Sequence, residues 1–234
     1  MGKRIVPVAV LIFLFFLFIP GFTARAAPSW AYPLENYWQR QTLKPFAKLV
    51  DPDFYIDRER LFPNRFYGYH AGVDLEVLPG EDEMALPVYA VGSGVVDFVG
   101  PVSGYGGVIL QYLDDSKITA LYGHVKIAGL KPRSGTRVTA GEKLTVLGRG
   151  YSPETGGERP HLHFALATGH RHYFAGHEKD LASLNANWLD PNNFLAYRLP
   201  SPIPTSSPLA PVTETVAALP SLWFRFLAWL NRLF

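Results

Sequence analysis

Between residues 61 and 194 the apolar side chains come in short runs that are separated by glycine-containing turns. The runs are rich in Val, Ile and Tyr, and none of them continues with the 3.6-residue period of a long helix. Such runs predict β-strands joined by tight turns. We therefore expect an all-β fold, an antiparallel β-sandwich or barrel-like domain with glycine-rich hairpins. The expected strands lie within 88–100 (two strands around a Gly-Ser-Gly turn), 107–113, 118–125, 143–147 and 161–166.

Composition narrows the class of protein. The chain has 234 residues, of which 48% are hydrophobic, so we expect one packed domain with appendages. It has no cysteine, which excludes a disulfide scaffold, a cysteine-ligated zinc site and a cysteine nucleophile. The 22 basic and 20 acidic residues give a net charge of +2, and loss of Lys3, Arg4 and Arg25 with the N-terminus would leave 19 against 20, a net charge of −1. This balance argues against a nucleic-acid partner.

The N-terminus has the layout of an export signal. Basic residues at positions 3 and 4 precede an apolar run over 5–19, which Pro20-Gly21 ends, and no charged residue occurs over 5–24. An Ala-Arg-Ala triplet at 24–26 offers a cleavage site. This pattern predicts a signal peptide over residues 1–27. The run is almost long enough to span a bilayer, so an uncleaved N-terminal anchor is the alternative. In both cases we expect export to the periplasm, the cell envelope or the extracellular space.

Three further segments flank the predicted β domain, which we place at residues 61–198. Residues 28–60 contain scattered aromatic side chains and are expected to pack on the domain as a lead-in. Residues 199–220 are rich in Pro, Ser and Thr and predict a linker. Residues 221–234 predict a short amphipathic helix, about 20 Å long and too short to span a bilayer. We expect this helix to contact a membrane surface, and docking onto the β domain is the alternative.

Histidines and carboxylates are the candidates for a metal or hydrolytic site. His161 and His163 lie two apart on a predicted strand, so their side chains share one face. With one carboxylate, two imidazoles would leave the fourth position of tetrahedral zinc open for water. His70 and Asp74 form a second pair, which alone is weak and could be surface polar residues. His124 ends another predicted strand, where a lone histidine is more often a satisfied turn residue.

The three remaining histidines are His170, His172 and His177, in a glycine-rich, charged stretch. No strand pattern aligns them, so we expect a solvated loop. A backup metal cluster is the alternative for these three residues.

Three separated motifs, taken together, are far more specific than any one of them. They are H-x-G-x-D at 70–74, Y-x-H at 122–124 and H-x-H at 161–163, with the framework stretches LPVYAVGSGVV, GYGGVILQY and SGTRVTAGEKLTVLG between them. On these residues the chain resembles the lysostaphin/LytM-type zinc metalloendopeptidases, the peptidoglycan endopeptidases that include Gly-Gly endopeptidases. The resemblance covers 61–167 closely and reaches back to Lys44.

The resemblance implies one zinc ion per chain, held by His70, Asp74 and His163. It implies His124 and His161 as the two catalytic histidines, acting as acid, base and oxyanion stabilisers around a zinc-activated water. The implied function is an exported metalloendopeptidase that hydrolyses peptidoglycan cross-links or stem peptides, and we expect a monomer. The resemblance leaves open which bond is cut, a glycine bridge or a D-amino-acid cross-link.

The chain also departs from the family pattern, and other functions remain open at this point. Ala165 stands where the family often has an acidic residue, the segment 148–159 is long, and the loop 168–187 is enlarged. Because loops around such a groove select substrate, these differences leave the peptide specificity open. The alternative function is a catalytically silent peptidoglycan-binding module that activates another wall hydrolase. A biotinyl- or lipoyl-carrier module is disfavoured because no lysine lies at a hairpin tip beside Met or Asp.

Overall fold

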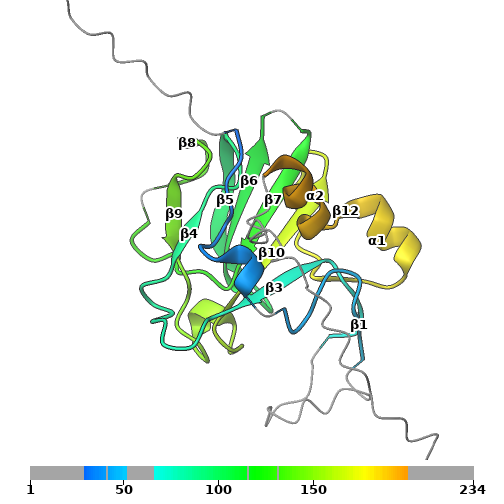
Figure 1. Ribbon diagram of the computed structural model, residues 1–234, viewed down its shortest axis with the longest axis horizontal. Helices are drawn as coiled ribbons and strands as arrows, with labels where there is room; N and C mark the ends of the chain where they lie inside the picture. Colours follow the sequence, from blue (N-terminus) through cyan, green and yellow to red (C-terminus); the bar gives the residue numbers. More distant parts are fainter. Residues whose placement is uncertain (1–28, 41, 52–65, 115, 131, 200–234) are drawn as a thin grey trace, which may run out of the picture.

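The computed structural model describes residues 29–40, 42–51, 66–114, 116–130 and 132–199 (Figure 1). The predicted signal segment, the linker from residue 200 onward and the predicted C-terminal helix lie outside the described residues. Within them the chain is mostly β, every strand pair is antiparallel, and the two α-helices are short. The all-β prediction is therefore confirmed. No helix among the described residues has the length and apolar character needed to cross a membrane.

The largest element is a seven-stranded sheet, in which β3 pairs with β10 and the remaining strands follow the order β12-β10-β7-β6-β5-β8. The bounds of its strands are β3 (Gly72–Glu76), β5 (Gly94–Val102), β6 (Gly106–Leu113), β7 (Ile118–Gly123), β8 (Arg137–Val138), β10 (His161–Thr168) and β12 (Trp188–Leu189).

Two small sheets and four short helices complete the described fold. One small sheet has the order β1-β2-β11 and the other consists of β4 and β9. The bounds are β1 (Leu49–Val50), β2 (Gly68–His70), β4 (Pro87–Tyr89), β9 (Lys143–Val146), β11 (His177–Glu178), α1 (Leu181–Asn187), α2 (Pro191–Arg198) and the 3-10 helices η1 (Tyr37–Gln39) and η2 (Pro153–Thr155).

The central strands β6, β7 and β10 are buried along nearly their whole length. Successive side chains of a strand point to opposite faces, so both faces of these strands must be covered. On one face Ile109, Tyr122 and Phe164 join the larger hydrophobic cluster. On the other face Leu110, Leu121 and Ala165 join a smaller cluster. The strands carry few exposed positions because the sheet is covered on both sides.

The segment expected to be one enlarged loop, 168–187, contains regular structure. It holds β11 and all of α1, and β12 and α2 follow it. Aspartates start both α-helices: Asp180 accepts a hydrogen bond from the backbone N–H of Ser183, and Asp190 accepts one from that of Asn192. Helices of seven and eight residues are too short to show a clear period in sequence.

The described part of the lead-in packs along the domain. Trp30 forms an isolated β-bridge with Gly92, and its ring meets that of Phe194 edge-on at 5.1 Å between centroids. Leu34 and Tyr37 are buried in the larger cluster. Further along, β1 pairs with β2, so the lead-in reaches the strand that ends at His70.

Candidate metal centre and its pocket

Strand register brings the H-x-H and H-x-G-x-D motifs together. His163 of β10 and Asp74 of β3 are direct partners in the antiparallel pair. Leu162 and Phe164, the neighbours of His163, point into the larger core cluster. Because side chains alternate along a strand, His161 and His163 both point to the opposite face, where Asp74 also lies. The predicted sharing of one face by the two histidines is therefore confirmed.

The glycine of H-x-G-x-D has a steric role. A Cβ atom on Gly72 would lie 2.5 Å from the carbonyl oxygen of Phe164 and 3.0 Å from Nε2 of His163. Any larger residue would push β3 away from β10 or displace the imidazole. Gly123 of Y-G-H is similar, since a Cβ there would lie 2.6 Å from the ring of Tyr105. Both motifs therefore need glycine for close approach of two strands or of a ring.

Three candidate ligand atoms converge at this place. Nε2 of His70 lies 3.0 Å from Nδ1 of His163, and Oδ1 of Asp74 lies 3.2 Å from the first atom and 3.0 Å from the second. Among the described residues this is the one group of three in which all ligand atoms lie within 4.8 Å of one another. All three side chains are buried.

The donor set fits a divalent metal ion. The other nitrogen of His70, Nδ1, lies 3.3 Å from the carbonyl oxygen of Pro45. A carbonyl oxygen can only accept, so Nδ1 carries the proton and Nε2 turns its lone pair toward the cluster. A second imidazole nitrogen and a carboxylate oxygen face the same point, and a cation there would bind all three. The Pro45 carbonyl would hold the His70 ring as backbone acceptors commonly do for metal-binding histidines.

Asp74 is held in its charged form. Burial by itself raises the pKa of a carboxyl group, but His161, His70 and His163 around it outweigh this effect and hold the pKa of Asp74 well below its usual value. Arg159, which is largely buried, donates from Nη2 to Oδ2 of Asp74 at 3.2 Å and binds both oxygens of Glu76. The sequence analysis did not single out Arg159.

His124 lies at the end of β7 in a left-handed backbone conformation, with φ of 61°. This conformation is uncommon outside glycine and is concentrated at functional sites. Nδ1 of His124 donates to the carbonyl oxygen of Thr155 at 2.9 Å, so Nε2 is left without the proton. Burial lowers the pKa of His124 to about 4, although nearby Asp74 opposes the shift. The ring is therefore neutral at pH 7.

His161 has the same arrangement. Its Nδ1 donates to the carbonyl oxygen of Arg159 at 2.8 Å, and its Nε2 lies 3.4 Å from Oδ2 of Asp74. Burial lowers the pKa of His161 well below its ordinary value, against the opposing charge of Asp74. The rings of His124 and His161 lie 4.3 Å apart between centroids. The long segment 148–159 thus supplies both backbone acceptors that set the tautomers of these two histidines.

Tyr105 and His177 complete the pocket, and neither was singled out for it by the sequence analysis. Tyr105 is buried, and its hydroxyl lies 3.3 Å from Nε2 of His163, on the side of the ring opposite the cluster. His177, expected in a solvated loop, is instead half-buried in β11 and lines the pocket. That prediction was wrong because a two-residue strand leaves no periodic signal in sequence.

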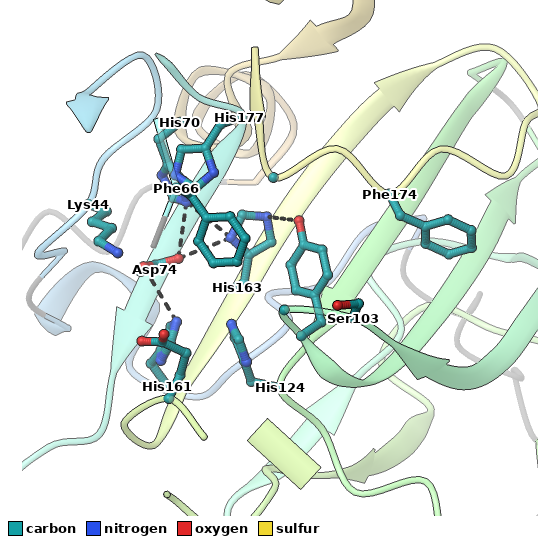
Figure 2. Close-up of a pocket in the computed structure, with 14 residues that line it drawn as sticks. Lys44, Phe66, His70, Asp74, Ser103, His124, His161, His163, Phe174 and His177 are labelled. Atoms are coloured by element: carbon teal, nitrogen blue, oxygen red, sulfur yellow. Dashed lines mark hydrogen bonds and ion pairs between the residues drawn. The ribbon is translucent and has the colours of Figure 1, made fainter. Parts of the chain in front are cut away.

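Figure 2 shows His70 and His177 on one side of Asp74, with His161 and His124 on the other.

The other two loop histidines lie elsewhere. His170 and His172 are half-exposed, and their Nε2 atoms lie 3.1 and 2.9 Å from the same oxygen of Asp97. For these two the expected exposure to solvent is confirmed. The three loop histidines do not form a common metal-binding group among the described residues.

The described residues thus form an antiparallel β domain with one candidate metal site, made of two histidines and one aspartate. This site lies in a pocket that His124 and His161 also line. Residues 68–174 match the family model described as Peptidase family M23. This match agrees with the lysostaphin/LytM-type resemblance of the three motifs. Comparison with curated proteins finds no match.

Solved structures with a similar fold include peptidases. The LytU structure is 22% identical and has a TM-score of 0.45, over 68% of this chain and 86% of that one. Lysostaphin from Staphylococcus simulans, an antimicrobial peptidase, is 23% identical and has a TM-score of 0.46, over 74% of this chain and 56% of that one. The catalytic domain of EnpA, a prophage-encoded M23 protein from Enterococcus faecalis, is 20% identical with a TM-score of 0.41, over 71% of this chain and 95% of that one. At these identities and TM-scores the solved structures carry no argument about function, which has to come from the residues of the site and from the family match.

Proposed function

We propose that this protein is an exported zinc metalloendopeptidase that hydrolyses peptide bonds in bacterial peptidoglycan, at cross-links or in stem peptides. The observation that carries the proposal is the convergence of Nε2 of His70, Nδ1 of His163 and a carboxylate oxygen of Asp74, next to two histidines with unprotonated Nε2 atoms. The family match supports the peptidase class. Peptidoglycan as substrate is supported by the motif resemblance.

His70, Asp74 and His163 would hold the zinc ion. When bound, zinc in such a site lowers the pKa of a water molecule and polarises the carbonyl of the scissile bond. The imidazole and carboxylate donors suit zinc, and three protein ligands are the usual number in catalytic zinc sites.

His124 and His161 would move the proton. Both rings donate from Nδ1 to backbone carbonyls, so both reach the pocket with an unprotonated Nε2. One of them takes the proton of the attacking water, and the resulting imidazolium then has an N–H directed at the pocket. That N–H can stabilise the developing oxyanion and afterwards protonate the leaving amine. Neither ring offers such a donor before it has accepted a proton.

The test is digestion of purified peptidoglycan by the zinc-loaded protein, followed by mass spectrometry of the released fragments. We expect new peptide termini, no release after the metal is removed with a chelator, and recovery when zinc is added back. The position of the new termini would identify the bond. Co-sedimentation with peptidoglycan without any new termini would contradict the proposal and support the silent binding module.

Export is the second part of the proposal and is supported by the N-terminal sequence pattern alone. Its test is the mass of the protein recovered from the producing cells after fractionation. Recovery from the envelope or medium with the N-terminal segment removed would support cleavage near residue 27. Recovery from the cytoplasm only would contradict export.

A further inference from the structure

A fifth histidine, His177, borders the candidate metal centre. Strand β11 pairs with β2 so that His177 is the direct partner of His70, and the two ring centroids lie 5.4 Å apart. The side chain lines the same pocket as the five predicted residues (Figure 2). His177 is not among the three ligand residues that come together.

One nitrogen of His177 has no partner within the described part of the chain. Its Nε2 atom is buried from solvent and makes no hydrogen bond there. Buried polar atoms in folded proteins are nearly always paired, so an unpaired one in a pocket indicates a bond that a ligand completes. An imidazole nitrogen in this place can donate to a carbonyl oxygen or accept from an amide N–H of a bound peptide.

The chain makes room for this side chain with two glycines. A Cβ atom on Gly68 would lie 2.5 Å from the carbonyl oxygen of Glu178, and one on Gly176 would lie 2.7 Å from the hydroxyl of Tyr105. Both glycines are needed for β11 to lie against β2 and over Tyr105. The following residue, Glu178, anchors the strand because one of its carboxylate oxygens accepts hydrogen bonds from three side chains.

An aromatic ring covers the histidine. Phe66 stacks on His177 with centroids 5.6 Å apart and an interplanar angle of 14°. Phe66 is 38% exposed and itself lines the pocket. The stack limits rotation of the imidazole, so the direction of its unpaired nitrogen is defined before any ligand arrives.

We propose that His177 is a substrate-binding residue whose Nε2 hydrogen-bonds an uncharged peptide group of the substrate backbone on the His70 side of the scissile bond. The proposal rests on the peptidase function proposed above and assigns to this chain a contact outside the five motif residues. Phe66 contributes the apolar wall that holds the imidazole in place. The enlarged loop thereby takes part in substrate selection.

The test compares three variants of the zinc-loaded protein on a soluble cross-linked muropeptide dimer. His177→Phe keeps the stack on Phe66 and removes the nitrogen, whereas His177→Gln places an amide near the Nε2 position. His172→Phe, on the same loop but outside the pocket, is the matched control. We expect His177→Phe to raise KM roughly three- to tenfold, as loss of one hydrogen bond does, with kcat within about twofold. His177→Gln should recover part of the loss, and His172→Phe should match wild type.

Two further measurements make the proposal independent of turnover. Zinc content should be unchanged in His177→Phe, and loss of zinc would overturn the proposal by making His177 a metal ligand. Binding of the same dimer, measured by calorimetry in the His161→Ala background, should weaken when His177→Phe is added. Hydrolysis with an unchanged KM and unchanged binding would overturn this inference and leave the proposed function intact. Absence of hydrolysis together with weaker binding in His177→Phe would contradict the proposed peptidase function and leave the peptide contact of His177 supported.

Discussion

His163 and Asp74 face each other directly across the β10–β3 pair, and Nδ1 of the histidine lies 3.0 Å from Oδ1 of the aspartate. The candidate metal centre is thus a consequence of strand register. A slip of one residue in this pair would turn His163 toward the hydrophobic core and bring Leu162 or Phe164 to the pocket. The same register that buries the apolar residues of β10 therefore assembles the proposed ligands.

The first prediction concerns these ligands. Single replacement of His70, Asp74 or His163 by Ala should abolish retention of one zinc per chain, because two protein ligands rarely hold a catalytic zinc ion. Elemental analysis after dialysis measures this directly. His172→Ala, a half-exposed histidine outside the pocket, should keep the wild-type zinc content. Full zinc in His163→Ala would show that the ligand set is wrong.

The second prediction separates metal binding from proton transfer. His124→Ala and His161→Ala should keep zinc and lose activity by about 10²–10⁴-fold, the usual contribution of a general acid or base. The two rings share one arrangement, with Nδ1 on a backbone carbonyl, so we expect a large loss in both. Rates on a cross-linked muropeptide, together with zinc content, test this. A wild-type rate in either variant would remove that histidine from the mechanism.

The sequence is sufficient to predict part of this site and insufficient for the rest. His161 and His163 could be placed on one face because a strand has period two, and His70, Asp74 and His124 could be joined to them by the order of the motifs. Tyr105, Arg159 and His177 act through contacts between elements distant in sequence. His177 meets His70 across 107 positions of the chain through a two-residue strand, and no local pattern marks such a pairing.

The fold, like the site, could be predicted from the sequence only in part. The strands near 107–113, 118–125 and 161–166 were predictable because their apolar runs are continuous and bounded by turn residues. The helices α1 and α2 were not, because seven or eight residues with aspartate caps are decided by packing rather than by periodicity. The pairing of β11 with β2 depends on Gly68, whose importance is visible only when Glu178 lies against it.

The third prediction tests Tyr105 as the group that orients His163. When Nδ1 of His163 binds the metal, its Nε2–H can donate to the Tyr105 hydroxyl, now 3.3 Å away. Tyr105→Phe removes only that oxygen and should weaken zinc binding by about 10–100-fold, as loss of such supporting hydrogen bonds usually does. Competition with a chromophoric chelator measures the affinity. Tyr122→Phe removes another buried tyrosine hydroxyl, one that bonds Gln111 outside the site, and should leave zinc affinity unchanged.

The fourth prediction is a pH dependence of stability in the metal-free protein. The pKa of His124 is about 4 in the folded protein against an ordinary 6.5, because the ring is buried. Above pH 6.5 both states are neutral and this residue adds no pH dependence. Between pH 6.5 and 4 the unfolded chain binds a proton that the folded protein does not, so stability falls with falling pH. One such residue contributes at most about 1.4 kcal/mol per pH unit.

Urea unfolding of the metal-free protein between pH 7 and 5 measures this slope. His124→Asn is a suitable variant, because asparagine tolerates the left-handed backbone and its amide can still donate to Thr155. The change in the free energy of unfolding per pH unit should be smaller in His124→Asn by the contribution of one titrating group. An identical slope in the variant would mean that His124 does not have a depressed pKa in the folded protein.

The last prediction concerns Glu178, which anchors the strand that carries His177. Oε1 of this buried carboxylate accepts hydrogen bonds from the Tyr173 hydroxyl, Nδ2 of Asn187 and Nε1 of Trp188. Glu178→Ala leaves three donors without an acceptor, at about 1–3 kcal/mol each before relaxation, so we expect a loss of about 3 kcal/mol. For a domain of this size that corresponds to a decrease in Tm of about 6–12 °C.

Glu178→Gln keeps a carbonyl acceptor and should lose less than half as much stability as Glu178→Ala. Glu142→Ala, which removes an exposed turn carboxylate, should change Tm by no more than a few degrees. Because β11 would lose its anchor, Glu178→Ala should also raise KM on the muropeptide dimer at temperatures where the protein is still folded. A wild-type Tm in Glu178→Ala would show that the three hydrogen bonds do not hold this segment in place.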